Sequence, residues 1–319
     1  MNKYILEFEK PLKNIEDKIE SLRKTAINTG VDVSDGILNL QEDLREQKKN
    51  IYGNLSRWQR VQLARHPNRP HAVDFINGIS DFFFEIHGDR KYSDDKSVIC
   101  GIGRMNDLNV VFIGQEKGRG TKDKVFRNFG MMRPEGYRKA LRVMRLAEKF
   151  SMPIISFIDT PGAYPGIGAE ERGQAQAIAE NLLCMSNLKV PTLSIVIGEG
   201  ASGGALGIGL TDKIICFENT WYSVISPEGC ASILFRDTGL SEKAADAMKV
   251  TAGDLKSFDI ADHVISEPLG GIHLDYAYAF KEVKDVIHDF IEVLQSQTIE
   301  ELIANRHQKY QNIGVWKNE

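Results

Sequence analysis

A glycine-rich segment at residues 192–209 has the composition of a backbone site for a negatively charged group. It opens with a short apolar run at 193–197, and five glycines follow within ten residues beside a single charged side chain. Such a run predicts a buried strand. Glycine lets a ligand approach the main chain closely, and the first amides of a helix beginning near Gly203 have no partner inside that helix. The segment therefore predicts an oxyanion or phosphate site made of main-chain amides, with an unliganded strand-to-helix turn as the alternative.

The same pattern occurs a second time, 38 residues upstream. Aligning residues 151–166 with residues 189–204 superposes one proline, one serine and two glycines of each segment. The aligned pairs are Pro153 with Pro191, Ser156 with Ser194, Gly162 with Gly200, and Gly166 with Gly204. Each copy contains a proline, a buried strand, a glycine-rich turn and a helix. The repeat predicts turns of a superhelix or adjacent strand–helix units, with both glycine-rich turns on one side.

A hydrolase site is the alternative function for the same residues. The segment Gly200-Ala-Ser-Gly-Gly204 fits the G-x-S-x-G pattern of a nucleophile elbow, with Ser202 as the nucleophile. Asp262 and His263 follow in the order serine, acid, base. The pattern is short, and any glycine-rich turn can match it. A serine hydrolase or peptidase is therefore kept as the second hypothesis.

Composition places the chain among ordinary globular proteins. Of its 319 residues, 42% are hydrophobic and 26% are charged. It has no apolar run of about 18 residues, and its first residues lack the pattern of a secretion signal, so we expect no membrane span and a cytoplasmic location. The four cysteines form no C-x-x-C pair and the seven histidines show no metal-binding spacing, so we expect reduced thiols and no metal in this chain.

Basic residues are concentrated in one stretch of an otherwise acidic chain. Residues 117–149 contain eleven Lys or Arg and three acidic residues, a net charge of +8, whereas the whole chain carries −4 and the remainder therefore −12. A local positive field suits a phosphate-bearing ligand or an acidic partner. A solvated helix face is the alternative, and nucleic acid is the least favoured partner.

Helical patterns dominate both ends of the chain. Apolar residues recur three or four positions apart at 12–26 and again at 276–294, which predicts amphipathic helices. A second N-terminal helix is predicted from Ser34 or Asp35, and a second C-terminal helix to about residue 310. Apolar stripes of this kind usually need a partner subunit.

The middle of the chain predicts an α/β core between these helical arms. Strands are expected at 98–103 and 109–114 as a hairpin, and helices at 73–84 and 169–186. The resulting domain division is an N-terminal helical arm at 1–70, a core at 71–272 and a C-terminal helical arm at 273–319.

Several long motifs together resemble one protein family. They are Asp159-Thr-Pro-Gly-Ala-Tyr-Pro-Gly166, Gly198-Glu-Gly-Ala-Ser-Gly-Gly-Ala205, Tyr222-Ser-Val-Ile-Ser-Pro-Glu-Gly-Cys-Ala231, and Arg127-Asn-Phe-Gly130 with Pro134-Glu-Gly-Tyr-Arg-Lys139. In this order they are similar to the α subunit of the carboxyltransferase component of bacterial acetyl-CoA carboxylase. The resemblance extends over nearly the whole chain and is most specific from about residue 114 to residue 231.

This resemblance implies a crotonase-like fold of ββα turns between the two arms. It implies transfer of a carboxyl group from carboxybiotin, on a biotin carboxyl carrier protein, to acetyl-CoA. The product would be malonyl-CoA, in the first committed step of fatty acid biosynthesis. The implied active site lies between an α and a β subunit of an α2β2 assembly, which works with biotin carboxylase. Zinc would belong to the β subunit alone, in agreement with the lack of a C-x-x-C pair here.

The resemblance also implies which residues carry the chemistry. Loss of the carboxyl group leaves negative charge on the ureido oxygen of biotin, and we expect the backbone amides of Gly203, Gly204 and Ala205 to stabilise it. The ureido nitrogen would then take a proton from acetyl-CoA. The residues expected to shape the substrate site are Gly162, Ala163, Gly166 and Gly200. The basic residues expected to guide the phosphates of CoA or the carrier are Lys117, Arg119, Lys122 and Arg127.

Overall fold

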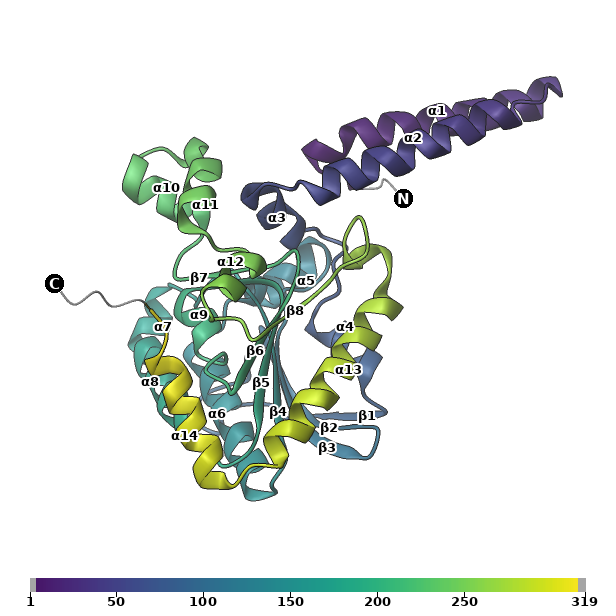
Figure 1. The fold of residues 1–319 in the computed structure, drawn as a ribbon. Coiled ribbons are helices and arrows are strands. Elements are labelled where there is room, and N and C mark those ends of the chain that lie inside the picture. The colour runs from purple at the N-terminus through teal and green to yellow at the C-terminus, as the bar shows by residue number, and fades with distance from the viewer. Residues whose placement is uncertain (1–3, 315–319) are drawn as a thin grey trace.

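A computed structural model describes residues 4–314 and places one mixed β-sheet at the centre of the molecule (Figure 1). The strands pair in the order β1-β2-β3-β4-β5-β6-β8, and β7 pairs with β5. The strands are β1 (Phe82–Glu85), β2 (Val98–Met105), β3 (Leu108–Gln115), β4 (Ile154–Thr160), β5 (Thr192–Ala201), β6 (Lys213–Phe217), β7 (Trp221–Ser223) and β8 (His263–Ile265). The first three strands are antiparallel, as the predicted hairpin requires, and every pairing from β3 onward is parallel.

Helices cover both faces of this sheet. Helices α6 and α8 pack on one face, and α4 and α13 pack on the other (Figure 1). The helices are α1 (Lys10–Thr29), α2 (Ser34–Gly53), α3 (Arg57–Ala64), α4 (Ala72–Ile79), α5 (Gly120–Phe126), α6 (Pro134–Lys149), α7 (Ile167–Glu171), α8 (Gln174–Asn187), α9 (Ser202–Leu206), α10 (Pro227–Phe235), α11 (Ser241–Met248), α12 (Ala252–Ser257), α13 (Tyr276–Gln295) and α14 (Ile299–Gln311). Short 3₁₀ segments lie at Glu7–Glu9, Asn128–Gly130, Thr238–Leu240 and Ile272–Leu274.

The central strands are buried on both sides because helices cover both faces. In β4, Ile154 and Ile158 belong to the apolar cluster that contains α6, whereas Ile155 and Phe157 belong to the cluster that contains α13. This alternation follows the two-residue period of a strand. Continuous apolar runs are typical of parallel strands covered on both sides. The buried strand predicted at 193–197 is confirmed as part of β5.

The predicted internal repeat forms two neighbouring parallel strands, β4 and β5. Ser156 lies level with Ser194, as the alignment of the two copies predicts. The register then shifts near the strand ends, so that Thr160 lies level with Gly200 and the offset between paired residues rises from 38 to 40. The repeat is therefore confirmed in the strands, whereas at the turns the shift displaces Gly162 from its predicted counterpart, Gly200.

The N-terminal helices α1 and α2 form a hairpin that projects away from the sheet (Figure 1). Helix α1 ends at Gly30, whose φ of 69° is the left-handed conformation that glycine favours at helix C-termini. The sequence predicts both helices, and the structure confirms them. The first residues of the predicted arm, 1–3, lie outside the described residues.

The C-terminal helix α13 packs along the sheet, unlike the N-terminal hairpin. Its residues Val283, Ile287 and Leu294 lie in one buried cluster with Phe157 and Phe217 of the strands. The last helix, α14, is buried at Leu302 and Arg306. The division at residues 70 and 272 stays a prediction, and the end of the predicted arm, 315–319, lies outside the described residues.

Two predicted helices differ from the observed ones. The helix predicted at 73–84 ends at Ile79, and Phe82–Glu85 instead forms the edge strand β1 beside β2. Three consecutive phenylalanines favour a strand because aromatic side chains pack well on a pleated surface. The helix predicted at 169–186 is divided into α7 and α8 by Gly173, whose φ of 80° interrupts a right-handed helix.

Three further properties bear on the expectations from composition. Within residues 4–314, no helix combines the length and the apolar character that crossing a bilayer requires. The same residues contain no group of three or more His, Cys, Asp or Glu side chains placed to hold a metal ion. All four cysteines are free, and three of them are buried.

Candidate active site

The predicted amide site lies where β5 ends and the short helix α9 begins. Residues 193–196 of β5 pair with β6, whereas its last residues, 199–201, pair with β7. Ser202, the first residue of α9, follows with a φ of 59°. Gly203 is partly exposed, whereas Gly204 and Ala205 are buried. The glycine-rich turn thus leaves the sheet at the C-terminal end of its parallel strands, the edge where α/β sheets commonly bind ligands.

The two glycine-rich turns touch each other at Gly204. A Cβ atom added at Gly204 would lie 2.3 Å from the carbonyl carbon of Gly162 and 2.5 Å from the nitrogen of Ala163. Gly162 has a φ of 145°, which residues with a side chain rarely adopt. The structure therefore places Gly162 and Ala163 directly against Gly204. Their contact with a substrate stays a prediction.

The other two glycines predicted for the substrate site occupy different positions. Gly200 lies beneath an aromatic ring, since a Cβ atom added there would lie 2.4 Å from Cδ2 of Tyr222. Gly166 precedes α7 as its N-cap residue and is partly exposed. Gly200 therefore packs against the ring of Tyr222 at the end of β5, while Gly166 lies partly exposed at the start of α7.

Two of the three predicted amides lack an acceptor in the described part of the chain. Gly203 and Gly204 are the second and third residues of α9, so they have no helical partner, and no bond from either amide to another segment occurs among residues 4–314. Ala205 is the fourth residue and the first whose amide faces a carbonyl of the same turn, that of Ala201. The amides of Gly203 and Gly204 are thus the ones available to an anionic ligand.

The carbonyl of Gly204 is held from the opposite side by buried side chains. Nε2 of Gln115, the last residue of β3, donates to it over 2.7 Å, and the hydroxyl of Tyr137 on α6 lies 3.4 Å away. Oε1 of Gln115 accepts from the amide of Asp159 at 3.2 Å. One side chain therefore links the end of β4 to α9. Sequence reasoning did not identify Gln115, because no local pattern marks it.

An ion network lies next to the two turns, with buried carboxylates at Asp159 and Glu199. The ammonium of Lys117 is 2.7 Å from Oδ1 of Asp159 and 2.7 Å from Oε1 of Glu199. Nε of Arg65, which follows α3, is 2.6 Å from Oε2 of Glu199, and its NH1 is 2.5 Å from Glu228 of α10. Glu199 is the only charged residue in the glycine-rich segment at 192–209, and a lone charge among apolar residues and glycines is the sequence signal that points to the network.

Burial and charge oppose each other in this network. Burial lowers the pKa of Lys117, but attraction to Asp159 and Glu199 outweighs it, and the net pKa is raised. Burial raises the pKa of Glu199, but Lys117 and Arg65 outweigh it, and the net pKa is lowered. Both groups are therefore charged at neutral pH, and each stabilises the other inside the protein.

The four basic residues predicted to guide phosphates differ in their surroundings. Lys117 lies in the buried network. Arg119 pairs with Asp74, and Arg127 lies 3.1 Å from Asp123. Lys122 is exposed and forms no ion pair with any described residue. Three of the four charges are thus committed to carboxylates of the same chain, and only Lys122 presents an unshared charge to solvent.

The residues of the alternative hydrolase site lie far apart. His263 on β8 is level with Ile215 on β6, which is level with Ile195 on β5. Ser202 lies seven residues beyond Ile195, about 23 Å farther along the strand at about 3.3 Å per residue. Asp262 accepts instead from the amide of Ile214. The structure therefore assembles no serine–histidine–aspartate triad from these residues.

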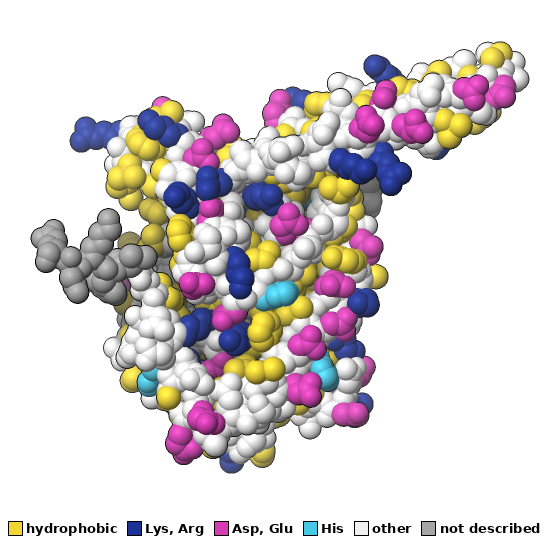
Figure 2. All heavy atoms as spheres, viewed as in Figure 1, with side chains coloured by type: hydrophobic (Ala, Val, Ile, Leu, Met, Phe, Trp, Pro, Cys, Tyr) yellow, Lys and Arg dark blue, Asp and Glu magenta, His cyan; other side chains and the backbone are white. Residues whose placement is uncertain are grey.

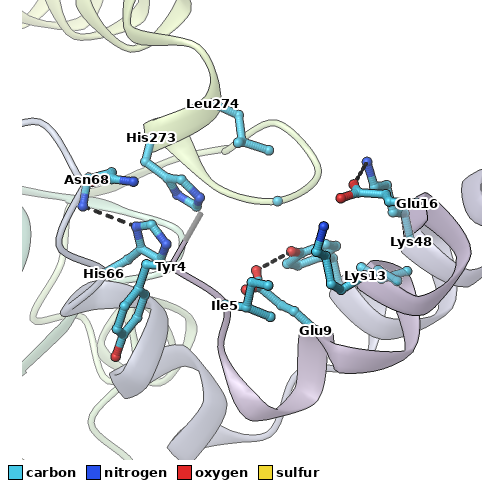
Figure 3. A pocket seen from close by; sticks show the side chains of 13 residues that line it. Tyr4, Ile5, Glu9, Lys13, Glu16, Lys48, His66, Asn68, His273 and Leu274 are labelled. Atoms are coloured by element: carbon cyan, nitrogen blue, oxygen red, sulfur yellow. Dashed lines mark hydrogen bonds and ion pairs between the residues drawn. The ribbon is translucent and has the colours of Figure 1, made fainter. Parts of the chain in front are cut away.

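A separate pocket lies where the N-terminal hairpin meets the core (Figure 3). Its volume is about 120 Å³, and none of the predicted site residues lines it. On one side the rings of His66 and His273 stack 3.8 Å apart, and on the other Tyr52 donates to Glu9 over 2.5 Å. Its walls therefore combine the hairpin with the segment that leads into α13, away from both glycine-rich turns.

The α10–α11 lobe, residues 227–248, is connected to the glycine-rich segment, because Glu228 of α10 pairs with Arg65, which also pairs with Glu199. Its helices pack on each other through Cys230, Ala231 and Ala244. On its outer surface Ile233 and Leu234 are 70% and 66% exposed, and Figure 2 shows hydrophobic side chains gathered there. Exposed apolar groups in one place mark an interaction surface.

Solved structures with the same architecture are enzymes that act on carboxyl groups. Transcarboxylase 12S, solved with methylmalonyl-coenzyme A and methylmalonic acid bound, matches with a TM-score of 0.59 at 18% identity over 72% of this chain and 42% of its own, so this chain spans less than half of it. A Pseudomonas malonate decarboxylase hetero-tetramer in complex with coenzyme A matches with a TM-score of 0.60 at 12% identity, over 74% and 91%. The predicted crotonase-like fold is confirmed, and the fold is that of the crotonase-like carboxyltransferases.

The sequence identifies the family within that class. Residues 5–314 match the family described as "Acetyl co-enzyme A carboxylase carboxyltransferase-like", and the chain belongs to this family of transferases. Proteins named acetyl-coenzyme A carboxylase carboxyl transferase subunit alpha from Flavobacterium johnsoniae and Staphylococcus haemolyticus are 50% and 51% identical over 98% of this chain and 99% of theirs. The corresponding Xanthomonas oryzae protein is 50% identical over 99% of both chains. The resemblance seen in the motifs is confirmed.

Proposed function

We propose that this chain is the α subunit of an acetyl-CoA carboxylase carboxyltransferase. It transfers a carboxyl group from carboxybiotin, on a biotin carboxyl carrier protein, to acetyl-CoA and forms malonyl-CoA. The observation that carries the proposal is the pair of unpartnered amides at Gly203 and Gly204, of which Gly204 lies against the glycine-rich turn after β4 at Gly162. The family and the full-length relatives named as α subunits support the same assignment.

The chain contributes hydrogen-bond donors at the place where charge develops. Carboxybiotin supplies the carboxyl group, and its ureido nitrogen supplies the base once that group has left. The amides of Gly203 and Gly204 would donate to the ureido oxygen, and one such donor typically stabilises a transition state by about 3 kcal/mol. Ala205 belongs to the same turn but faces a helical carbonyl, so the stabilisation falls chiefly to the two glycines. Gly162 and Ala163 form the adjoining wall.

The basic residues take different roles in this proposal. Lys117 organises the ends of β4 and β5 through Asp159 and Glu199. Lys122 is the cation that we assign to the phosphates of CoA or to acidic groups of the carrier. Arg119 and Arg127 are paired within the chain, so their contribution is to hold the loop around α5.

A β subunit completes the site. The α10–α11 lobe exposes Ile233 and Leu234, and its Glu228 is connected through Arg65 to Glu199 of the glycine-rich segment, so we assign this lobe to the subunit interface of an α2β2 assembly. The β subunit brings a zinc ribbon and a second amide site for the acetyl-CoA enolate. Biotin carboxylase supplies the loaded carrier, and the assembly works in the cytoplasm.

Reconstitution from purified subunits tests the proposal. The chain alone should form no malonyl-CoA from acetyl-CoA and carboxybiotin, and addition of the β subunit should restore formation. Full activity of the isolated chain would contradict the assignment. The assay is run with radiolabelled bicarbonate, carrier and biotin carboxylase, so that the carboxyl donor is the natural one.

Two variants of Ser202 separate transfer from hydrolysis. Ser202→Ala removes the hydroxyl, and Ser202→Gly removes it while also relieving the positive φ of 59°. A carboxyltransferase that uses main-chain amides should keep most of its activity in both variants. A serine hydrolase would lose nearly all of it in both.

A further inference from the structure

We propose that Gln115 is a positioning residue for the carboxyl transfer, holding α9 so that its amides face the substrate. The inference rests on the proposed function, but its geometry stands independently. Gln115 ends β3, which belongs to neither copy of the internal repeat, and its side chain is fully buried. It is closed off from solvent and binds main-chain groups of Gly204 and Asp159, so it acts through the backbone that it binds.

The side chain of Gln115 bridges the two segments that carry the glycine-rich turns. Its Nε2 donates to the carbonyl of Gly204 over 2.7 Å, and its Oε1 accepts from the amide of Asp159 over 3.2 Å. Sδ of Met132 lies 3.5 Å from the same Nε2. The nitrogen and the oxygen of the side-chain amide therefore bind different segments, which fixes the orientation of the amide group.

Holding the carbonyl of Gly204 fixes the direction of the neighbouring amide. The peptide between Gly204 and Ala205 is planar and trans, so its N–H points opposite to its C=O. That N–H belongs to Ala205 and faces the carbonyl of Ala201 in the same turn, so a Gly204 carbonyl held by Gln115 fixes the turn that also carries the amides of Gly203 and Gly204. The hydroxyl of Tyr137, 3.4 Å from the same carbonyl, is a weaker second donor.

Helix α9 needs this support because it has only five residues. A helix of one turn does not persist by its own hydrogen bonds. At the far end of the helix, Asn181 donates to the carbonyl of Gly207 over 2.9 Å. Gln115, with Tyr137 as the weaker donor, holds α9 at its middle residue, Gly204, and Gln115 also ties the helix to β4.

The test compares Gln115→Met with a control variant, both assembled with the β subunit. Methionine keeps the length of the side chain but can neither donate to Gly204 nor accept from Asp159. The control is Thr211→Val, which removes a buried hydrogen bond of 2.9 Å to Ser194 at the opposite end of β5. Melting temperature, kcat and the KM for acetyl-CoA are measured for both.

A positioning role predicts a loss in kcat alone. Because a misplacement of about 1 Å can cost about 100-fold in rate, Gln115→Met should lower kcat by about 10- to 100-fold and change KM less than about threefold. Thr211→Val should lower the melting temperature but leave kcat near that of the unchanged protein. Equal kcat in the two variants would overturn the positioning role.

Two further measurements keep the inference testable if Gln115→Met fails to fold or if the proposed function fails. Tyr137→Phe removes the weaker donor and should lower kcat by a few-fold at constant KM. Exchange of the hydrogen-bonded amides of residues 205–207 should quicken in Gln115→Met or in Tyr137→Phe, while exchange in β5 should not. Unchanged exchange would overturn the anchoring of α9, whatever reaction the assembly performs. Absence of malonyl-CoA formation by the unchanged protein would instead count against the proposed function alone.

Discussion

Gly204 and Gly162 lie so close that a Cβ atom on the first would be 2.3 Å from the carbonyl carbon of the second. Both partners in this contact are main chain, so no side-chain rotation can relieve an overlap. The contact brings the turn after β4 against the turn after β5. The position of one glycine-rich turn is therefore set by the other.

Replacing Gly204 by alanine should abolish carboxyl transfer. The added methyl group forces the two turns apart and displaces the amides, so we expect kcat to fall by about 100-fold or more. The control is Gly253→Ala in α12, where an added Cβ meets no atom within 4 Å. That change should leave activity intact and raise stability by about 0.5–1 kcal/mol. Normal activity of Gly204→Ala would show that the contact is not needed.

Removing the charge of Lys117 should destabilise the protein strongly. Lys117→Met leaves the buried Asp159 without this cation and Glu199 with Arg65 alone, and breaking a buried pair typically costs about 3–5 kcal/mol of unfolding free energy. Urea denaturation measures the change. The control, Lys13→Met, disrupts an exposed pair with Asp17 on α1 and should shift the midpoint little. Similar midpoints for the two variants would contradict the structural role of the network.

Acidification should weaken the protein through His66. Burial lowers the pKa of His66 from its ordinary 6.5, with attraction to Glu9 as the largest opposing effect. Because the folded pKa lies below the unfolded one, the unfolded chain binds the proton first. The stabilisation from neutral His66 is complete above about pH 6.5 and is lost as the pH falls from there toward the lower folded pKa.

The pH dependence can be assigned with one variant. In the structure Nδ1 of His66 accepts from the amide of Asn68 over 3.2 Å, and asparagine offers a similar acceptor that does not titrate. His66→Asn should therefore flatten the fall in unfolding free energy just below pH 6.5. An unchanged slope would assign the pH dependence to other groups.

Arg306 should be required for attachment of the last helix, α14. It is fully buried, and its guanidinium donates to Asp212 over 2.7 Å and 2.9 Å and to the carbonyls of three residues, Met185, Leu188 and Val190. Arg306→Met should lower the unfolding free energy by about 3–5 kcal/mol. Arg306→Lys should restore only part of it, because an ammonium lacks the planar fork. The exposed Arg23 on α1 provides the control, and Arg23→Lys should be neutral.

Local sequence patterns predict those parts of the fold that depend on an amphipathic helix or on the internal repeat. Ser156 and Ser194 occupy level positions because two copies of one pattern form adjacent parallel strands. The exit of α1 at Gly30 follows from the local conformation of glycine. In contrast, Phe82–Glu85 forms a strand where a helix is predicted, because its three phenylalanines favour a strand once β2, which lies outside the segment, offers a pairing edge.

The candidate site divides in the same way. The glycines of both turns are visible in the sequence because glycine-rich turns are local features. Gln115 reaches Gly204 across 89 positions, and Arg65 reaches Glu199 across 134, so no spacing rule could pair them. The charges of Lys117 and Arg127 suggested a surface for phosphate, but only tertiary structure supplies the carboxylates that they contact.

The two-residue shift in register after Ile158 gives the two copies of the internal repeat different surroundings at their loops. Without the shift, the two copies would end in equivalent loops with the same exposure to solvent. With the shift, the loop after β4 packs against Gly204, while the loop after β5 carries the amides that have no partner among residues 4–314. The difference between the two copies therefore arises in the paired strands that precede the loops. A deletion that removed the shift would make the two copies equivalent again and would separate the loop after β4 from the amides.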